Sequence, residues 1–113
     1  MHIFERLNGK KLEVSYEGGA HYRMTYLSDD QLRWEALHEL SDGETPQGTE
    51  PYAALEVTDG IYNVNWVEED GMTASQILNF HTNKVSVFLT FADEKARGGR
   101  DHVLLQGEFR IAD

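Results

Sequence analysis

The sequence predicts an all-β protein of about eight antiparallel strands that form an up-and-down barrel. Apolar and polar residues alternate with a period of two along most of the chain, as in strands that bury one face. Clusters of Gly, Asn and Asp interrupt this alternation at the short intervals typical of hairpins. No stretch has a convincing helical period, so we expect no helix. Eight hairpin-connected strands are roughly the number that closes around side chains or one small ligand.

The first three predicted strands are separated by short turns and followed by a long polar segment. Alternation is clear in residues 11–16, 20–28 and 31–36, with turns at residues 17–19 and 29–30. Residues 38–50 are polar and rich in residues that break regular structure, so we predict a mobile loop there.

Five more strands are predicted in the second half of the chain. They cover residues 52–57, 61–67, 72–80, 85–91 and 102–111, and a second loop covers residues 92–101. The alternative fold is a β-sandwich, whose crossing connections need longer loops than most of those available here.

Period-two alternation also predicts which side chains face the interior. The predicted inward residues are Leu12, Val14, Tyr16, Tyr22, Met24, Tyr26, Leu32, Trp34, Leu55, Tyr62, Val64, Trp66, Leu78, Val85, Val87, Leu89, Val103, Leu105 and Phe109. Ile111 is expected on the same side of the last strand as Phe109. The predicted interior is therefore apolar and rich in aromatic rings.

Length, charge and cysteine content limit the possible functions. A chain of 113 residues fits one domain, residues 1–113, that can bury its own core. A formal charge of −10 disfavours nucleic-acid and membrane-surface partners. There is no cysteine, so thiolate chemistry and disulfides are excluded, and with no apolar leader segment we expect a cytoplasmic protein.

Two segments of the chain carry a resemblance to known families. Residues 58–68, Thr-Asp-Gly-Ile-Tyr-Asn-Val-Asn-Trp-Val-Glu, are followed by residues 71–80, Gly-Met-Thr-Ala-Ser-Gln-Ile-Leu-Asn-Phe. This pattern resembles the MoaF-like group, named after a molybdenum-cofactor biosynthesis protein, and more distantly the phenolic acid decarboxylases. Both are calycin-type, lipocalin-like barrels, and the resemblance covers most of residues 9–91.

The decarboxylase resemblance implies only part of a catalytic site. Tyr16 and Glu68 match a carboxylate-binding tyrosine and a proton-handling glutamate of that family. The second tyrosine position is Val14, and no arginine precedes residues 52–57. A lyase would lack the groups that position an anionic substrate, so the resemblance favours the MoaF-like branch.

The candidate ligand site combines the aromatic interior with a few polar groups. The candidate ligand-binding residues are Tyr16, Tyr22, Tyr26, Trp34, Tyr62, Trp66, Glu68 and Gln76. Glu68 falls at the inner rim beside Trp66, where burial would raise its pKa toward the range of general acid–base catalysis. The alternatives are that the aromatic residues fill the barrel completely and that Glu68 belongs to a solvated acidic turn.

The five histidines have no metal-ligand spacing, so we expect no metal and no cofactor. Three functions remain open. The first is binding of a small aromatic or apolar molecule without catalysis, and the second is a decarboxylase-like lyase that uses Tyr16 and Glu68. The third is an interaction protein with a filled barrel. Residues 85–91 are apolar on both faces, with Phe88 outward, so we expect either a homodimer interface there or a cover by the loop at residues 92–101.

Overall fold

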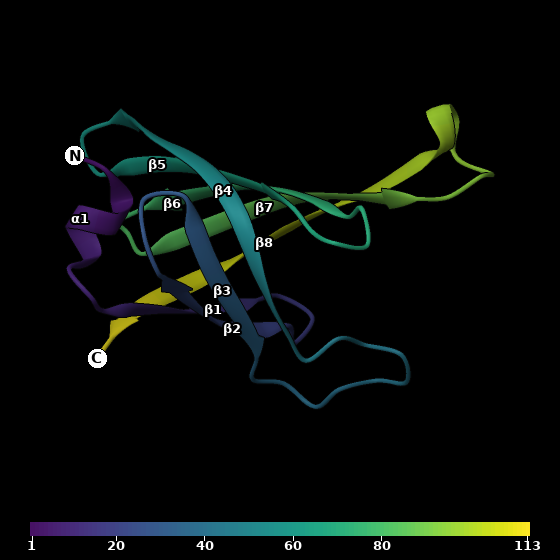
Figure 1. Cartoon of the computed structure of the whole chain (residues 1–113), viewed down its shortest axis with the longest axis horizontal. Helices are drawn as coiled ribbons and strands as arrows, with labels where there is room; N and C mark the ends of the chain where they lie inside the picture. Colours follow the sequence, from purple (N-terminus) through teal and green to yellow (C-terminus); the bar gives the residue numbers. More distant parts are fainter.

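The computed structural model describes all residues from Met1 to Asp113 and confirms the predicted barrel. Eight antiparallel strands pair in sequence order, and the last pairs with the first to close the sheet (Figure 1). The strands are β1 (Lys11–Tyr16), β2 (His21–Tyr26), β3 (Gln31–Ala36), β4 (Gln47–Thr58), β5 (Ile61–Val67), β6 (Thr73–Asn79), β7 (Lys84–Ala92) and β8 (Arg100–Ala112). Closure leaves the sheet without a free edge along its length.

The two ends of the barrel differ. A helix, α1 (Ile3–Leu7), and both chain termini lie at one end, which we call the closed end (Figure 1). The long loop after β3, the β5–β6 turn and the tip of the β7–β8 hairpin lie at the other, which we call the mouth. The short 3₁₀ helix η1 (Arg97–Gly99) is at this hairpin tip.

Helix α1 contradicts the expectation of an all-strand chain. The imidazole of His2 caps it by accepting a hydrogen bond from the Phe4 amide, and Asn8 ends it in the left-handed conformation. A helix of five residues is too short to produce a visible period, which is why alternation missed it. No helix in the structure has the length and apolarity needed to cross a membrane.

Helix α1 packs into the closed end of the barrel (Figure 1). Ile3 and Leu7 of α1 are buried there as part of one hydrophobic core with the strands. Tyr62 is fully buried, and its hydroxyl donates to the Met1 carbonyl oxygen at 2.8 Å. The helix therefore fills this end of the lumen, and any internal space must lie toward the mouth.

Strand β4 is longer than predicted, and the face that it turns to the barrel interior is the one predicted to face outward. It begins at Gln47, so residues 47–50 belong to the strand and not to the loop. Tyr52 is buried, whereas Leu55 is 57% exposed, so the predicted inward position of Leu55 was wrong. Residues 52–55 are apolar or aromatic at both parities, and alternation cannot choose a face in such a run.

The last two strands also extend beyond the predicted bounds. Strand β7 reaches Ala92 and β8 starts at Arg100, so parts of the predicted loop at residues 92–101 are strand. Val103 and Ile111 lie toward opposite ends of β8 and are at least one-third exposed, although both were expected inside with Phe109. On β8, alternation gives the correct side of the strand, but not where the barrel interior ends.

Candidate functional site

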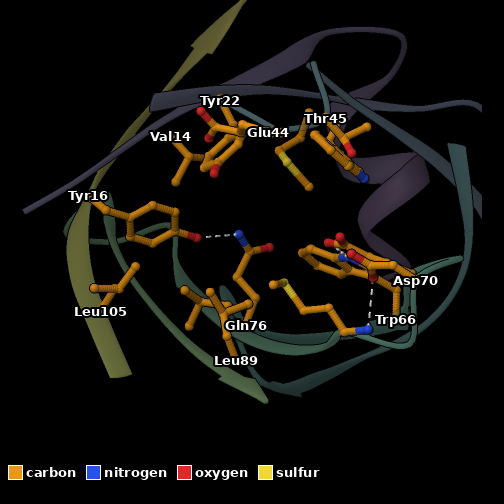
Figure 2. A pocket seen from close by; sticks show the side chains of 16 residues that line it. Val14, Tyr16, Tyr22, Glu44, Thr45, Trp66, Asp70, Gln76, Leu89 and Leu105 are labelled. Atoms are coloured by element: carbon orange, nitrogen blue, oxygen red, sulfur yellow. Dashed lines mark hydrogen bonds between the residues drawn. The ribbon is translucent and has the colours of Figure 1, made fainter. Parts of the chain in front are cut away.

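The mouth half of the barrel contains a cavity of about 310 Å³ (Figure 2). Ten of its sixteen lining residues are hydrophobic. The lining consists of Val14, Tyr16, Tyr22, Met24, Trp34, Gly43, Glu44, Thr45, Trp66, Glu68, Asp70, Met72, Gln76, Val87, Leu89 and Leu105. A concave apolar site with a few convergent polar groups is the usual form of a small-molecule pocket.

Tyr16 and Gln76 form a buried polar pair in the wall of the cavity. The Gln76 Nε2 group donates to the Tyr16 hydroxyl at 3.0 Å (Figure 2). Burial raises the pKa of Tyr16 to about 12, so this hydroxyl stays protonated at neutral pH. Gln76 is 1% exposed, and its Oε1 atom has no hydrogen-bond partner in the protein. The pair thus presents a free carbonyl acceptor to the cavity.

Aromatic rings from neighbouring strands make up another part of the wall. The Tyr22 and Trp34 rings meet edge to face with centroids 6.0 Å apart, and Tyr16 lies 6.5 Å from Tyr22. Gly48 of β4 lies directly against the Trp34 indole, where a Cβ atom would come within 2.8 Å of Nε1. Glycine at this position therefore lets the indole lie flat against β4.

Glu68 lies at the rim of the cavity beside Trp66, as alternation predicted. The Trp66 Nε1 group donates to Glu68 Oε2 at 3.2 Å. Burial is the main cause that raises the pKa of Glu68, and the nearby carboxylates Asp70 and Glu50 add to it. Glu68 is therefore a partly desolvated acid and not merely part of a solvated turn.

All the charged groups that line the cavity are acids: Glu44, Glu68 and Asp70. A smaller hollow next to it shares Trp34, Thr45, Glu68 and Asp70 and adds Glu50 and Glu69. No Lys or Arg lines either space. Arg100 donates to the Gly71 and Thr90 carbonyl oxygens and holds the base of the β7–β8 hairpin. The mouth is thus an acidic region without a lining cation.

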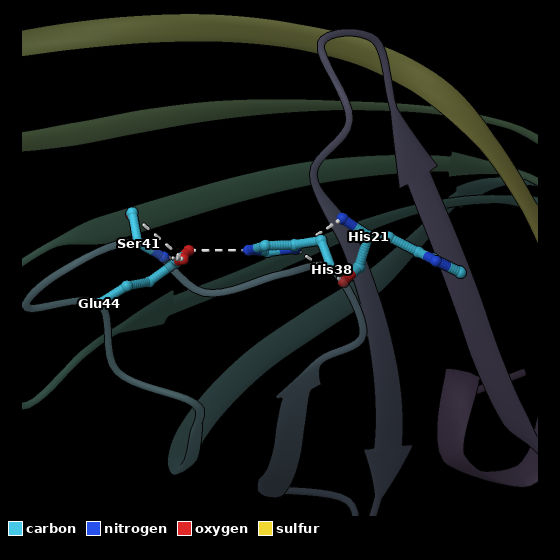
Figure 3. A network of polar contacts seen from close by, with 4 residues as sticks. All are labelled: His21, His38, Ser41 and Glu44. Atoms are coloured by element: carbon cyan, nitrogen blue, oxygen red, sulfur yellow. Dashed lines mark hydrogen bonds and ion pairs between the residues drawn. The ribbon is translucent and has the colours of Figure 1, made fainter.

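The loop between β3 and β4 is held against the barrel by a histidine (Figure 3). His38 Nε2 lies 2.8 Å from Glu44 Oε2, and its Nδ1 lies 3.1 Å from the His21 carbonyl oxygen. The Ser41 amide also donates to Glu44 at 3.1 Å. These contacts fix the loop so that Glu44 reaches the cavity.

The His38–Glu44 pair predicts a pH dependence of this loop. The hydrogen bond to Glu44 raises the pKa of His38, and the same bond lowers the pKa of Glu44. The contribution of Glu44 is lost as the pH falls through its lowered pKa, and that of His38 is lost as the pH rises through its raised pKa. We therefore expect the amides of residues 38–46 to be best protected between these two values.

Hydrogen exchange, corrected for intrinsic rates, measures this protection. In the His38→Gln variant, the fall in loop protection at alkaline pH should disappear. The amides around β6 serve as an internal reference. Equal protection of the loop on both sides of the raised His38 pKa would contradict the predicted role of the pair.

Six of the eight predicted site residues line the cavity: Tyr16, Tyr22, Trp34, Trp66, Glu68 and Gln76. Tyr26 and Tyr62 also point inward and are buried, but they lie toward the closed end and do not line it. Tyr26 packs against Tyr52 with centroids 5.3 Å apart, and Tyr62 packs against Phe80.

Several lining residues were not predicted. Glu44 and Thr45 reach the cavity from the loop, and Asp70 and Met72 come from the β5–β6 turn. Alternation carries no information about loops, because it reports only the two faces of a strand. The acidic run at residues 68–70 was the one available signal, and parity selected only Glu68 from it.

These features define a class: a small closed β-barrel, filled by a helix at one end and hollow at the other. The sequence pattern of the MoaF-like family matches residues 8–100. The chain therefore belongs to the MoaF-like family, as the resemblance in residues 58–80 indicated. No curated protein matches the sequence.

One similar solved structure is from Burkholderia vietnamiensis and is described as that of "a putative beta-lactamase". It shares 25% sequence identity with this chain, with a TM-score of 0.75, and the match covers 92% of this chain and 93% of that one. None of the residues that line the cavity here is Ser or Lys, the pair used by serine beta-lactamases. The likeness supports the fold.

Proposed function

We propose that this protein binds a small aromatic or partly apolar molecule in the mouth half of the barrel. The observation that carries the proposal is the combination of an apolar cavity of about 310 Å³ with the free acceptor of Gln76 in its wall. An unpaired buried polar atom costs about 1–3 kcal/mol, so this wall favours an occupant that supplies a donor. Four aromatic rings, those of Tyr16, Tyr22, Trp34 and Trp66, provide the apolar contact.

Two measurements test this proposal. Native mass spectrometry of the protein purified from a lysate should show a retained small molecule. Titration with 4-hydroxybenzyl alcohol, a neutral aromatic probe, should change the fluorescence of Trp34 and Trp66, both of which line the cavity. A bare protein whose fluorescence does not respond to the probe would contradict the proposal.

A lyase function has weaker support. Tyr16 and Glu68 do line the same cavity. Each, however, is already engaged in a hydrogen bond, Tyr16 with Gln76 and Glu68 with Trp66. No Lys or Arg lines the cavity to hold a substrate carboxylate, so an anionic phenolic acid would lack this positioning and electrostatic contribution. Loss of hydroxycinnamic acid absorbance on incubation would favour the lyase, and a Glu68→Gln variant with an undiminished rate would remove Glu68 from the chemistry.

We further propose that two copies of this chain pair through the outer surface of β4–β8. No outward side chain of β4, β5 or β6 is charged, although the whole chain carries −10. Leu55, Phe88 and Leu104 are exposed on this surface, at 57%, 43% and 61%. On β7 and β8 the outward charges are paired, Lys84 with Glu108 and Arg110 with Glu13. A largely apolar surface whose charges cancel is where a second, equally acidic copy meets the least repulsion.

On β5 and β6, three polar side chains of this outer surface are already paired with one another. Ser75 donates to Asn65, and Asn65 donates to Asn63, both at 2.6 Å. Such groups lose few water contacts when a partner covers them. Light scattering after size exclusion should give twice the mass of 12.9 kDa, and Leu104→Glu should give a monomer. A monomeric parent protein would contradict pairing.

A further inference from the structure

We propose that the ligand of the cavity is an organic cation: a small arylalkylamine, protonated at neutral pH, that carries a hydroxyl group on its ring. This inference rests on the proposed binding function and adds the chemical class of the ligand. It draws on two separate parts of the site, the acidic mouth and the polar pair of Tyr16 and Gln76.

The side chains at the mouth favour a positively charged group. Glu68 and Asp70 line both the cavity and the adjoining hollow, and Glu50 and Glu69 line the hollow beside them. Glu50 is 5% exposed and has no salt-bridge partner. These carboxylates face one another without a cation, and each would be stabilised by an ammonium group among them.

The pKa values of these groups support the same conclusion. Negative neighbours contribute to the raised pKa of Glu50, of Glu68 and of the Tyr22 hydroxyl, although burial is the larger cause in each case. Glu44 is the exception among these acids, because its pairing with His38 lowers its pKa. An anionic ligand would add to this repulsion, whereas a cation would relieve it.

The aromatic walls fit a cation as well as an apolar ring. Trp34, Trp66 and Tyr22 line the same space as Glu68, and the faces of such rings attract ammonium groups. Trp66 is tied to Glu68 by its indole N–H, which places a ring and a carboxylate side by side. This pairing of aromatic and acidic groups selects an amine over a neutral molecule of the same shape.

The opposite wall fits a hydroxyl group. The Gln76 carbonyl points into the cavity without a partner (Figure 2). Tyr16 accepts from Gln76, and its own proton has no acceptor in the protein. A phenol can donate to the Gln76 carbonyl and accept from the Tyr16 hydroxyl at the same time. If the Gln76 amide were flipped, with its oxygen and nitrogen exchanged, one of these two atoms would still form the hydrogen bond to Tyr16. The other would still lack a partner.

Three probes of nearly equal shape separate charge from aromatic contact. They are 4-hydroxybenzylamine, 4-hydroxybenzyl alcohol and 4-hydroxybenzoate, which are cationic, neutral and anionic at neutral pH. Calorimetric titration of the intact protein should show the amine binding at least about tenfold more tightly than the alcohol. The benzoate should bind most weakly of the three.

Variants locate the charge preference in the mouth. Glu68→Gln should reduce the amine affinity about tenfold more than it reduces the alcohol affinity. Glu5→Gln removes the same charge from an exposed position on α1 at the closed end and serves as the matched control. Gln76→Leu should abolish the preference for 4-hydroxybenzylamine over benzylamine, which lacks the hydroxyl.

The outcomes distinguish this inference from the proposed function. If the alcohol or the benzoate binds as tightly as the amine, the cavity is a binding site but the inference of a cationic ligand is overturned. If the amine is preferred equally by the parent and by Glu68→Gln, the mouth carboxylate is not the cause and the inference also fails. If none of the three probes binds, the proposed function itself is contradicted.

Discussion

The Gly107→Ala substitution is expected to lower the free energy of unfolding by about 3 kcal/mol. Gly107 pairs with Tyr16 where β8 meets β1 and closes the barrel. An added Cβ would lie 2.0 Å from the Ser15 carbonyl oxygen and 2.8 Å from the Tyr16 Cα. Both are backbone atoms that cannot rotate away, so the two strands would have to separate at the closure.

Urea unfolding followed by tryptophan fluorescence measures this loss of stability. Gly98→Ala is the matched control, because Gly98 has a φ of +68° but no atom within 4 Å of its Cβ position. This control should lower the free energy of unfolding only by the strain of an alanine in the left-handed conformation, about 1–2 kcal/mol. If Gly107→Ala were no more destabilising than Gly98→Ala, the contact at the closure would not be the constraint described above.

The Val87→Phe substitution is expected to weaken binding of 4-hydroxybenzyl alcohol about a hundredfold. Val87 is buried on β7 and lines the cavity opposite the aromatic wall of β2 and β3. A phenyl ring there would take the volume that the ligand needs. Because the ring fills existing space, the stability of the fold should change little.

Thr25→Phe provides the control for this experiment. Thr25 has nearly the same shape as valine and lies on β2 between the inward residues Met24 and Tyr26. Its side chain therefore points outward, and the added ring should leave the affinity unchanged. Calorimetry of the two variants checks both expectations. Full affinity in Val87→Phe, or an equal loss in Thr25→Phe, would place the ligand outside the lumen.

The strand order and most of the cavity wall were predictable from the sequence. Tyr16, Trp34 and Trp66 lie on strands with one apolar and one polar face, so their direction follows from parity. The barrel follows from short connections between strands, because these leave each strand beside its neighbour in sequence.

Three parts of the structure could not be predicted in this way. Alternation says nothing about how far along the barrel a side chain lies, so Tyr26 and Tyr62 were grouped with residues at the other end. Helix α1 is too short to have a period, although Asn8-Gly9 was a usable signal for a helix end. Glu44 reaches the site only through the contact between His38 and the loop, which has no sequence pattern.

The most direct test of the central claim uses the two tryptophans. Trp34 and Trp66 are the only tryptophans in the chain, and both line the cavity, so a ¹H–¹⁵N spectrum contains two indole signals that report on it. Titration with 4-hydroxybenzylamine should shift both indole signals and the side-chain amide of Gln76. Signals that stay in place at saturating probe, or shifts confined to the outer surface of β4–β8, would contradict binding in the lumen.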